Sequence, residues 1–104
     1  MIAEMLEKNP DDTFLNYAAA LEHRKENHTA KAIRIFKKII DQDPDYLATY
    51  YQLGKLLEEK GKASEALEVY KKGHALAVIK KDIKAMGELS EAMMILDTGD
   101  DETW

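Results

Sequence analysis

The chain has 104 residues, of which 45% are hydrophobic and 34% charged, as is typical of one globular domain. Its formal net charge of −5 disfavours nucleic-acid phosphates and anionic lipid as partners, because the paired lysines all have acidic residues close by. The absence of cysteine excludes disulfides and thiolate chemistry.

The N-terminal residues 1–9 are expected to form the tail of a preceding helix or an N-capping helix. They match the chain at an offset of 34 residues, with Met5 on Ile39 and Leu6 on Ile40. Acidic residues stand where a signal peptide needs a basic region, and no apolar run reaches membrane-spanning length. We therefore expect a cytoplasmic protein without a membrane partner. Two alternatives remain. Either the natural protein begins with this short N-terminal helix, or the sequence is a piece of a longer repeat array.

The same offset relates residues 13–44 to residues 47–80. Pro10 falls on Pro44 and Tyr17 on Tyr51. The further matches are Asp11 with Asp45, Ala32 with Ala66, and Lys37-Lys38 with Lys71-Lys72. A fixed period of this length indicates stacked units, each a single supersecondary element.

Each unit is predicted to be a pair of helices. Apolar and small residues follow helical spacing in both halves of the second unit, at Tyr50, Leu53, Gly54, Leu57 and at Ala63, Ala66, Leu67, Tyr70. Asn27 and Gly61 separate the halves, and both residue types tolerate the left-handed conformation that ends a helix. The segments Asn9-Pro10-Asp11 and Asp43-Pro44-Asp45 separate the units, since proline stops a helix and aspartate suits the start of the next.

A last helix is predicted over 82–96, with Asp82 as its N-cap. Its apolar residues recur at helical spacing, while Glu88, Glu91 and Lys84 take the other side. These apolar residues are Ile83, Met86, Leu89, Met93 and Leu96. The helix would cover the apolar end of the second unit. The acidic residues 97–104 have no periodicity and are expected to be frayed, with Trp104 either a free end or an anchor for a neighbouring chain.

These features resemble the tetratricopeptide repeat (TPR) family. The second unit carries nearly the whole family signature, at Tyr50, Leu53, Gly54, Leu57, Gly61, Ala66, Tyr70 and Gly73. The first unit keeps Ala32, Phe36 and Pro44 but has Asn16 and His23 where the family favours aromatic residues. The resemblance implies an all-α fold: a single domain over 1–104 in which antiparallel helix-turn-helix repeats stack as a short right-handed TPR solenoid with a C-terminal capping helix.

The resemblance also implies a binding surface. In this family the first helix of each repeat lines the concave wall, and helical spacing selects the residues that point away from the core. They are Phe14, Tyr17, Leu21 and Arg24 in the first unit and Ala48, Tyr51, Lys55 and Glu58 in the second. The carboxylate clamp of some relatives is absent, because Tyr17, Leu21 and Gln52 occupy the corresponding positions. Packing of the tyrosines between helices, or of the last helix into the groove, is the competing interpretation.

No catalytic or metal site is expected. The histidines His23, His28 and His74 are scattered along the chain, without the clustering that zinc ligands show. No glycine-rich phosphate loop or nucleophile motif accompanies them, so we expect no enzyme activity and no cofactor.

The predicted function is a non-catalytic scaffold that binds a peptide or protein segment on its concave face. The peptide-binding candidates are Phe14, Tyr17, Leu21, Arg24, Tyr51 and Lys55. The alternative is a structural unit that forms a homodimer through exposed solenoid ends or a swapped terminal helix, because two repeats fall short of the number that usually stacks stably.

Overall fold

The computed structural model describes residues 2–101, with side chains through residue 96, as helices joined by short turns. Six α-helices and no strand occur over this range, which confirms the predicted all-α class. The chain divides into two compact units at Thr49 and Tyr50, and each is described by itself. None of the helices in the described range is both long and apolar enough to cross a membrane.

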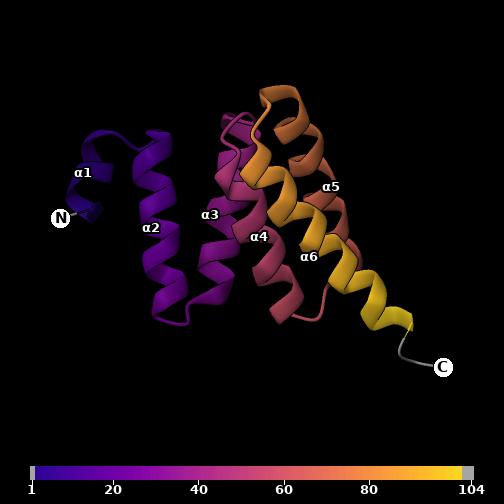
Figure 1. The fold of residues 1–104 in the computed structure, drawn as a ribbon. Helices are drawn as coiled ribbons and strands as arrows, with labels where there is room; N and C mark the ends of the chain where they lie inside the picture. The colour runs from indigo at the N-terminus through magenta and orange to yellow at the C-terminus, as the bar shows by residue number, and fades with distance from the viewer. Residues whose placement is uncertain (1, 102–104) are drawn as a thin grey trace. The chain divides into compact units, whose positions relative to one another are not determined.

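The first unit contains the short helix α1 (Ile2–Lys8) and the helix pair α2 (Thr13–Lys25) and α3 (Thr29–Gln42). Figure 1 shows α2 and α3 as antiparallel neighbours, with α1 beside α2. The small residues Ala19 and Ala20 of α2 are buried, as are Phe36 and Ile39 of α3. Small side chains on one helix and large ones on the other allow close packing.

The loop before α2 is tied to α3 by polar contacts. Asp12 is the N-cap of α2, since its Oδ1 accepts from the backbone N–H of Leu15 at 2.8 Å. Asp11, the aspartate expected in this role, instead accepts from Gln42 at 3.3 Å and lies 3.8 Å from the Lys38 ammonium. Asp11 directly precedes the N-cap, so it lies outside the first helical turn and contacts α3 instead.

The second unit holds most of α4 (Ala48–Glu59), followed by α5 (Ala63–Lys80) and α6 (Ile83–Asp101). The largest fully buried side chain here is Tyr70 of α5. Leucines of α4 and Leu89 and Ala92 of α6 are also buried in this unit. Figure 1 shows α5 and α6 running antiparallel along each other.

Helices α2, α4 and α5 end in the same way. One residue at each end is left-handed: Asn27 with φ 66°, Gly61 with φ 77° and Lys81 with φ 58°. The backbone N–H of each left-handed residue and that of the residue after it donate to carbonyls in the last turn of the helix. An example is His28 N, which donates to His23 O at 2.8 Å. This is the Schellman motif, and it confirms the breaks predicted at Asn27 and Gly61. Lys81 was not expected to take this conformation.

Helix α6 differs in part from the predicted helix over 82–96. Asp82 does cap it, because its Oδ1 accepts from Ala85 N at 3.0 Å. Ile83, expected on the covered face, is 75% exposed, since it lies in the first turn before α6 is covered by its neighbours. The helix continues past Leu96 to Asp101, because apolar periodicity marks burial and its loss does not by itself stop a helix. Trp104 lies outside the described residues.

Candidate functional site

The two repeats each place a tyrosine of the first helix against an aromatic ring of the second. Tyr17 contacts Phe36 with ring centroids 5.8 Å apart, and Tyr51 contacts Tyr70 at 6.3 Å. Both rings are tilted, the arrangement that the quadrupoles of aromatic rings favour. The sequence offset that relates these residues therefore reappears as an equivalent contact in each unit.

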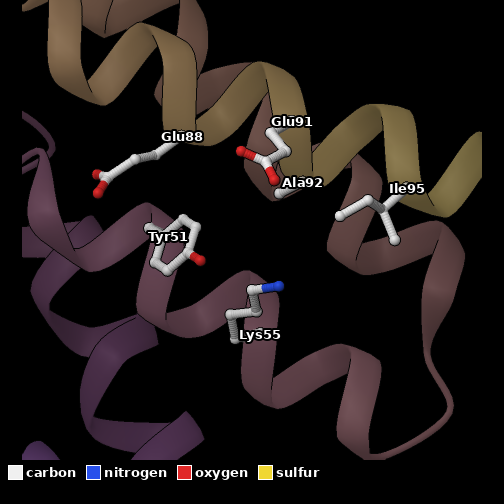
Figure 2. A pocket seen from close by; sticks show the side chains of 6 residues that line it. All are labelled: Tyr51, Lys55, Glu88, Glu91, Ala92 and Ile95. Atoms are coloured by element: carbon white, nitrogen blue, oxygen red, sulfur yellow. The ribbon is translucent and has the colours of Figure 1, made fainter.

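A pocket of about 240 Å³ opens beside Tyr51 in the second unit. Tyr51 and Lys55 of α4 form one wall. The other wall comes from α6, which contributes Glu88, Glu91, Ala92 and Ile95. Figure 2 shows the tyrosine hydroxyl, the Lys55 side chain and the Glu91 carboxylate converging on the space between the helices. Helix α6 thus lies beside this part of the α4 face and lines the pocket with it.

The pocket combines one cation with two anions. The Lys55 ammonium lies 5.5 Å from the centre of the Tyr51 ring, a cation–π distance. Glu88 and Glu91 are exposed and stand on the facing wall. The fixed side-chain charge of the lining residues is consequently negative, while Tyr51, Ala92 and Ile95 supply apolar contact.

The predicted site residues of the first unit have a different setting. Phe14 is 66% exposed, whereas Tyr17, Leu21 and Arg24 are half-buried. Tyr17 also contacts Tyr46, with centroids 5.3 Å apart, so its ring is held between two neighbours. Tyr17 therefore has a packing role in the first unit, and Phe14 offers the most accessible apolar surface of the four.

Helical spacing predicted that Tyr51 and Lys55 share one face, and the structure brings these two together. The α6 side of the pocket was not predicted, because Glu88 and Glu91 were placed only on the side of the last helix opposite its apolar residues. Their spacing of three residues was the available signal, since such residues share one side of a helix. Which side of α4 that face would meet depends on helix packing.

The histidines are not all scattered, contrary to the expectation from sequence. The rings of His23 and His28 have centroids 5.6 Å apart, and their Nδ1 atoms are separated by 3.4 Å. Only His74, on α5, belongs to the second unit. The spacing of His23 and His28 along the chain did not predict their contact. They meet because the left-handed Asn27 reverses the backbone between them.

The fold and the repeated contacts define a protein built of helix-turn-helix repeats. The model of the tetratricopeptide repeat family matches residues 23–77, more than half of the 104 residues. The chain belongs to the tetratricopeptide repeat family. This family is generally a non-catalytic protein-interaction fold, and the chain has the architecture of such a scaffold.

Solved structures agree with this assignment. A crystal structure of a tetratricopeptide repeat domain protein from Salinibacter ruber is 34% identical, with a TM-score of 0.80 over 84% of this chain and 97% of the other. A solution structure of such a domain from the same organism is 35% identical, with a TM-score of 0.81 over 86% and 90%. A Bordetella parapertussis protein has the same fold, with 23% identity and a TM-score of 0.83 over 95% and 86%. No curated protein matches the chain.

Proposed function

We propose that the chain is a scaffold that binds a peptide or protein segment on the face of its first helices. The observation that carries the proposal is the pocket between α4 and α6, where an aromatic ring and apolar side chains stand next to charged groups. Tyrosine suits such a surface because it offers a large contact area with few rotatable bonds and keeps a polar end.

The charges of the pocket favour a particular guest. Lys55 alone would attract an acidic side chain, but Glu88 and Glu91 outnumber it. A peptide that places a lysine or arginine beside an apolar residue would meet both the carboxylates and the Tyr51 ring. The proposed ligand is therefore a segment with a basic residue next to an apolar one.

A random peptide library displayed on phage tests this proposal. Peptides selected on the native protein are expected to contain basic residues beside apolar ones, and Glu91→Lys should weaken their binding about tenfold or more through like-charge repulsion. The matched control is Glu68→Lys, which makes the same charge change at an exposed position of α5. Its binding should equal that of the native protein.

Equal loss in both variants would mean that net charge and not the pocket governs binding. Undiminished binding by Glu91→Lys would place the ligand elsewhere on the chain. Circular dichroism of each variant shows whether the helices are intact. Lys55→Ala provides a further reading, because it removes the cation that opposes a basic guest and is expected to leave binding equal or stronger.

Self-association is the second candidate function. It is favoured by large apolar side chains that flank the turn between α5 and α6: Val78 is 48% exposed, Ile79 77% and Ile83 75%. Apolar surface of this kind can pair between copies. The mass of the protein in solution distinguishes this function from peptide binding.

A further inference from the structure

A group of three potential metal ligands lies at the C-terminal end of α2. His23, Glu26 and His28 each offer one ligand atom, and these atoms all lie within 4.8 Å of one another. The His28 Nδ1 atom is 3.4 Å from His23 Nδ1 and 3.6 Å from Glu26 Oε1. Two imidazole nitrogens and one carboxylate oxygen therefore converge on one small region of the first unit.

The backbone brings these residues together. In the Schellman motif that ends α2, His28 N donates to His23 O at 2.8 Å and Asn27 N donates to Arg24 O at 3.0 Å. In this motif the side chains of the two residues joined by the bond that spans five residues, here His23 and His28, commonly touch each other. They are usually apolar, but here both are imidazoles, so the turn itself holds two metal-ligating rings side by side.

The second repeat shows that the fold does not require these residues. At the positions equivalent to His23 and His28 it has Leu57 and Lys62, joined by the same backbone bond at 2.8 Å. The chain thus builds one turn twice and equips only the first copy with a pair of imidazoles. Stability of the turn alone does not explain their presence.

The separation of the nitrogens matches metal coordination. Two imidazole nitrogens bound at about 2.1 Å to one tetrahedral Zn²⁺ lie about 3.4 Å apart. The nitrogens of His23 and His28 are separated by 3.4 Å. A set of two histidines and one glutamate is an established Zn²⁺ ligand set, with water at the fourth position. The carbonyl end of a helix also favours positive charge.

We propose that His23, Glu26 and His28 bind a divalent transition-metal cation of the Zn²⁺ class through the Nδ1 atoms of both rings and the Glu26 carboxylate. The bound cation clamps the turn between α2 and α3 and so stabilises the first helix pair. Without the cation, one ring nitrogen donates a hydrogen bond to the other. The site is separate from the proposed peptide-binding pocket, which belongs to the second unit.

Titration of the protein, free of any polyhistidine tag, with ZnCl₂ tests the proposal by calorimetry and by NMR of the histidine rings. We expect saturable one-to-one binding, a higher midpoint of thermal unfolding, and ring shifts at His23 and His28 but not at His74. The double variant His23→Leu, His28→Lys copies the second repeat and keeps a sequence known to fit the turn. Its affinity for Zn²⁺ should fall by more than about tenfold, since even the loss of a residue that only hydrogen-bonds to a metal ligand lowers the affinity that much.

The matched control is His74→Gln, which removes the remaining imidazole and should bind Zn²⁺ as tightly as the native protein. Binding that survives in the double variant would overturn the proposal and indicate general attraction to surface carboxylates. Absence of saturable binding by the native protein, or equal shifts at all three histidines, would overturn it as well. Peptide binding in the double variant is expected to be unchanged, so failure of one proposal does not imply failure of the other.

Discussion

Among the glycines whose surroundings the structure describes, Gly54 has the closest side-chain neighbour, Tyr70. A Cβ atom at Gly54 would overlap the Tyr70 ring, and the ring cannot retreat easily because its hydroxyl donates to Glu58 Oε2. In the first repeat the equivalent residues are Ala20 and Phe36, both fully buried. The methyl group is thus tolerated where the ring has no hydroxyl to hold it in place.

The substitution Gly54→Ala is therefore expected to destabilise the protein by about 1–2 kcal/mol. Overpacking of a core costs about 1–3 kcal/mol, which the better helix propensity of alanine offsets only in part. Gly87→Ala is the control, because nothing lies within 4 Å of the added methyl on α6, and it should stabilise by about 0.5–1 kcal/mol. Urea denaturation measures both. Equal effects of the two substitutions would contradict the packing argument.

At the scale of elements, the shared ending of α2, α4 and α5 gives the chain its succession of antiparallel helices. The left-handed residue is asparagine in the first case and glycine in the second, both suited to positive φ. In the third case it is Lys81, whose Cβ makes this conformation costly by about 1–2 kcal/mol. A residue without a Cβ atom at position 81 is consequently expected to make the turn between α5 and α6 more stable.

Lys81→Gly is expected to stabilise the protein by about 0.5–1 kcal/mol, since relief of the left-handed strain exceeds the entropy that glycine loses on folding. Lys71→Gly, at an exposed position in the middle of α5, should destabilise by about 1 kcal/mol. Thermal unfolding followed by circular dichroism compares the two. Destabilisation by Lys81→Gly would show that the lysine side chain contributes more than its backbone strain costs.

For the whole molecule, the exposed aliphatic side chains at the α5–α6 turn bear on self-association. Ile79 and Ile83 are largely exposed, but a stable protein interface buries at least about 1,200 Å² in total. A few aliphatic side chains cover only a small part of that area. The net charge of −5 adds repulsion between copies.

We therefore expect sedimentation to find a monomer of 11.8 kDa at micromolar concentration, with association only when the protein is much more concentrated. The double variant Ile79→Lys, Ile83→Lys should abolish that association, and Ser90→Lys, an exposed change elsewhere on α6, should leave it unchanged. A tight dimer that the double variant disrupts would instead make self-association the principal function. A tight dimer that survives it would place the interface on other residues.

Much of the fold could be predicted from the sequence, because its signals are local. The repeat offset, the left-handed Asn27 and Gly61, and the cap at Asp82 all depend on residues close together in the chain. Half of the pocket could be predicted in the same way, since Tyr51 and Lys55 share one face of α4. The His23–His28 contact could also have been predicted, because a left-handed Asn27 places these two residues at the ends of one hydrogen bond of the Schellman motif.

The sequence by itself determined the helix pairs, the breaks within them at Asn27 and Gly61, and the face of α4 that carries Tyr51, because periodicity and capping act within a few residues. Only the tertiary structure decided that Glu88 and Glu91 of α6 stand opposite that face and make the pocket negative. It also decided that Tyr17 is held by Phe36 and Tyr46. The physical reason is that the placement of one helix on another depends on the fit of side chains from distant segments, which no local pattern records.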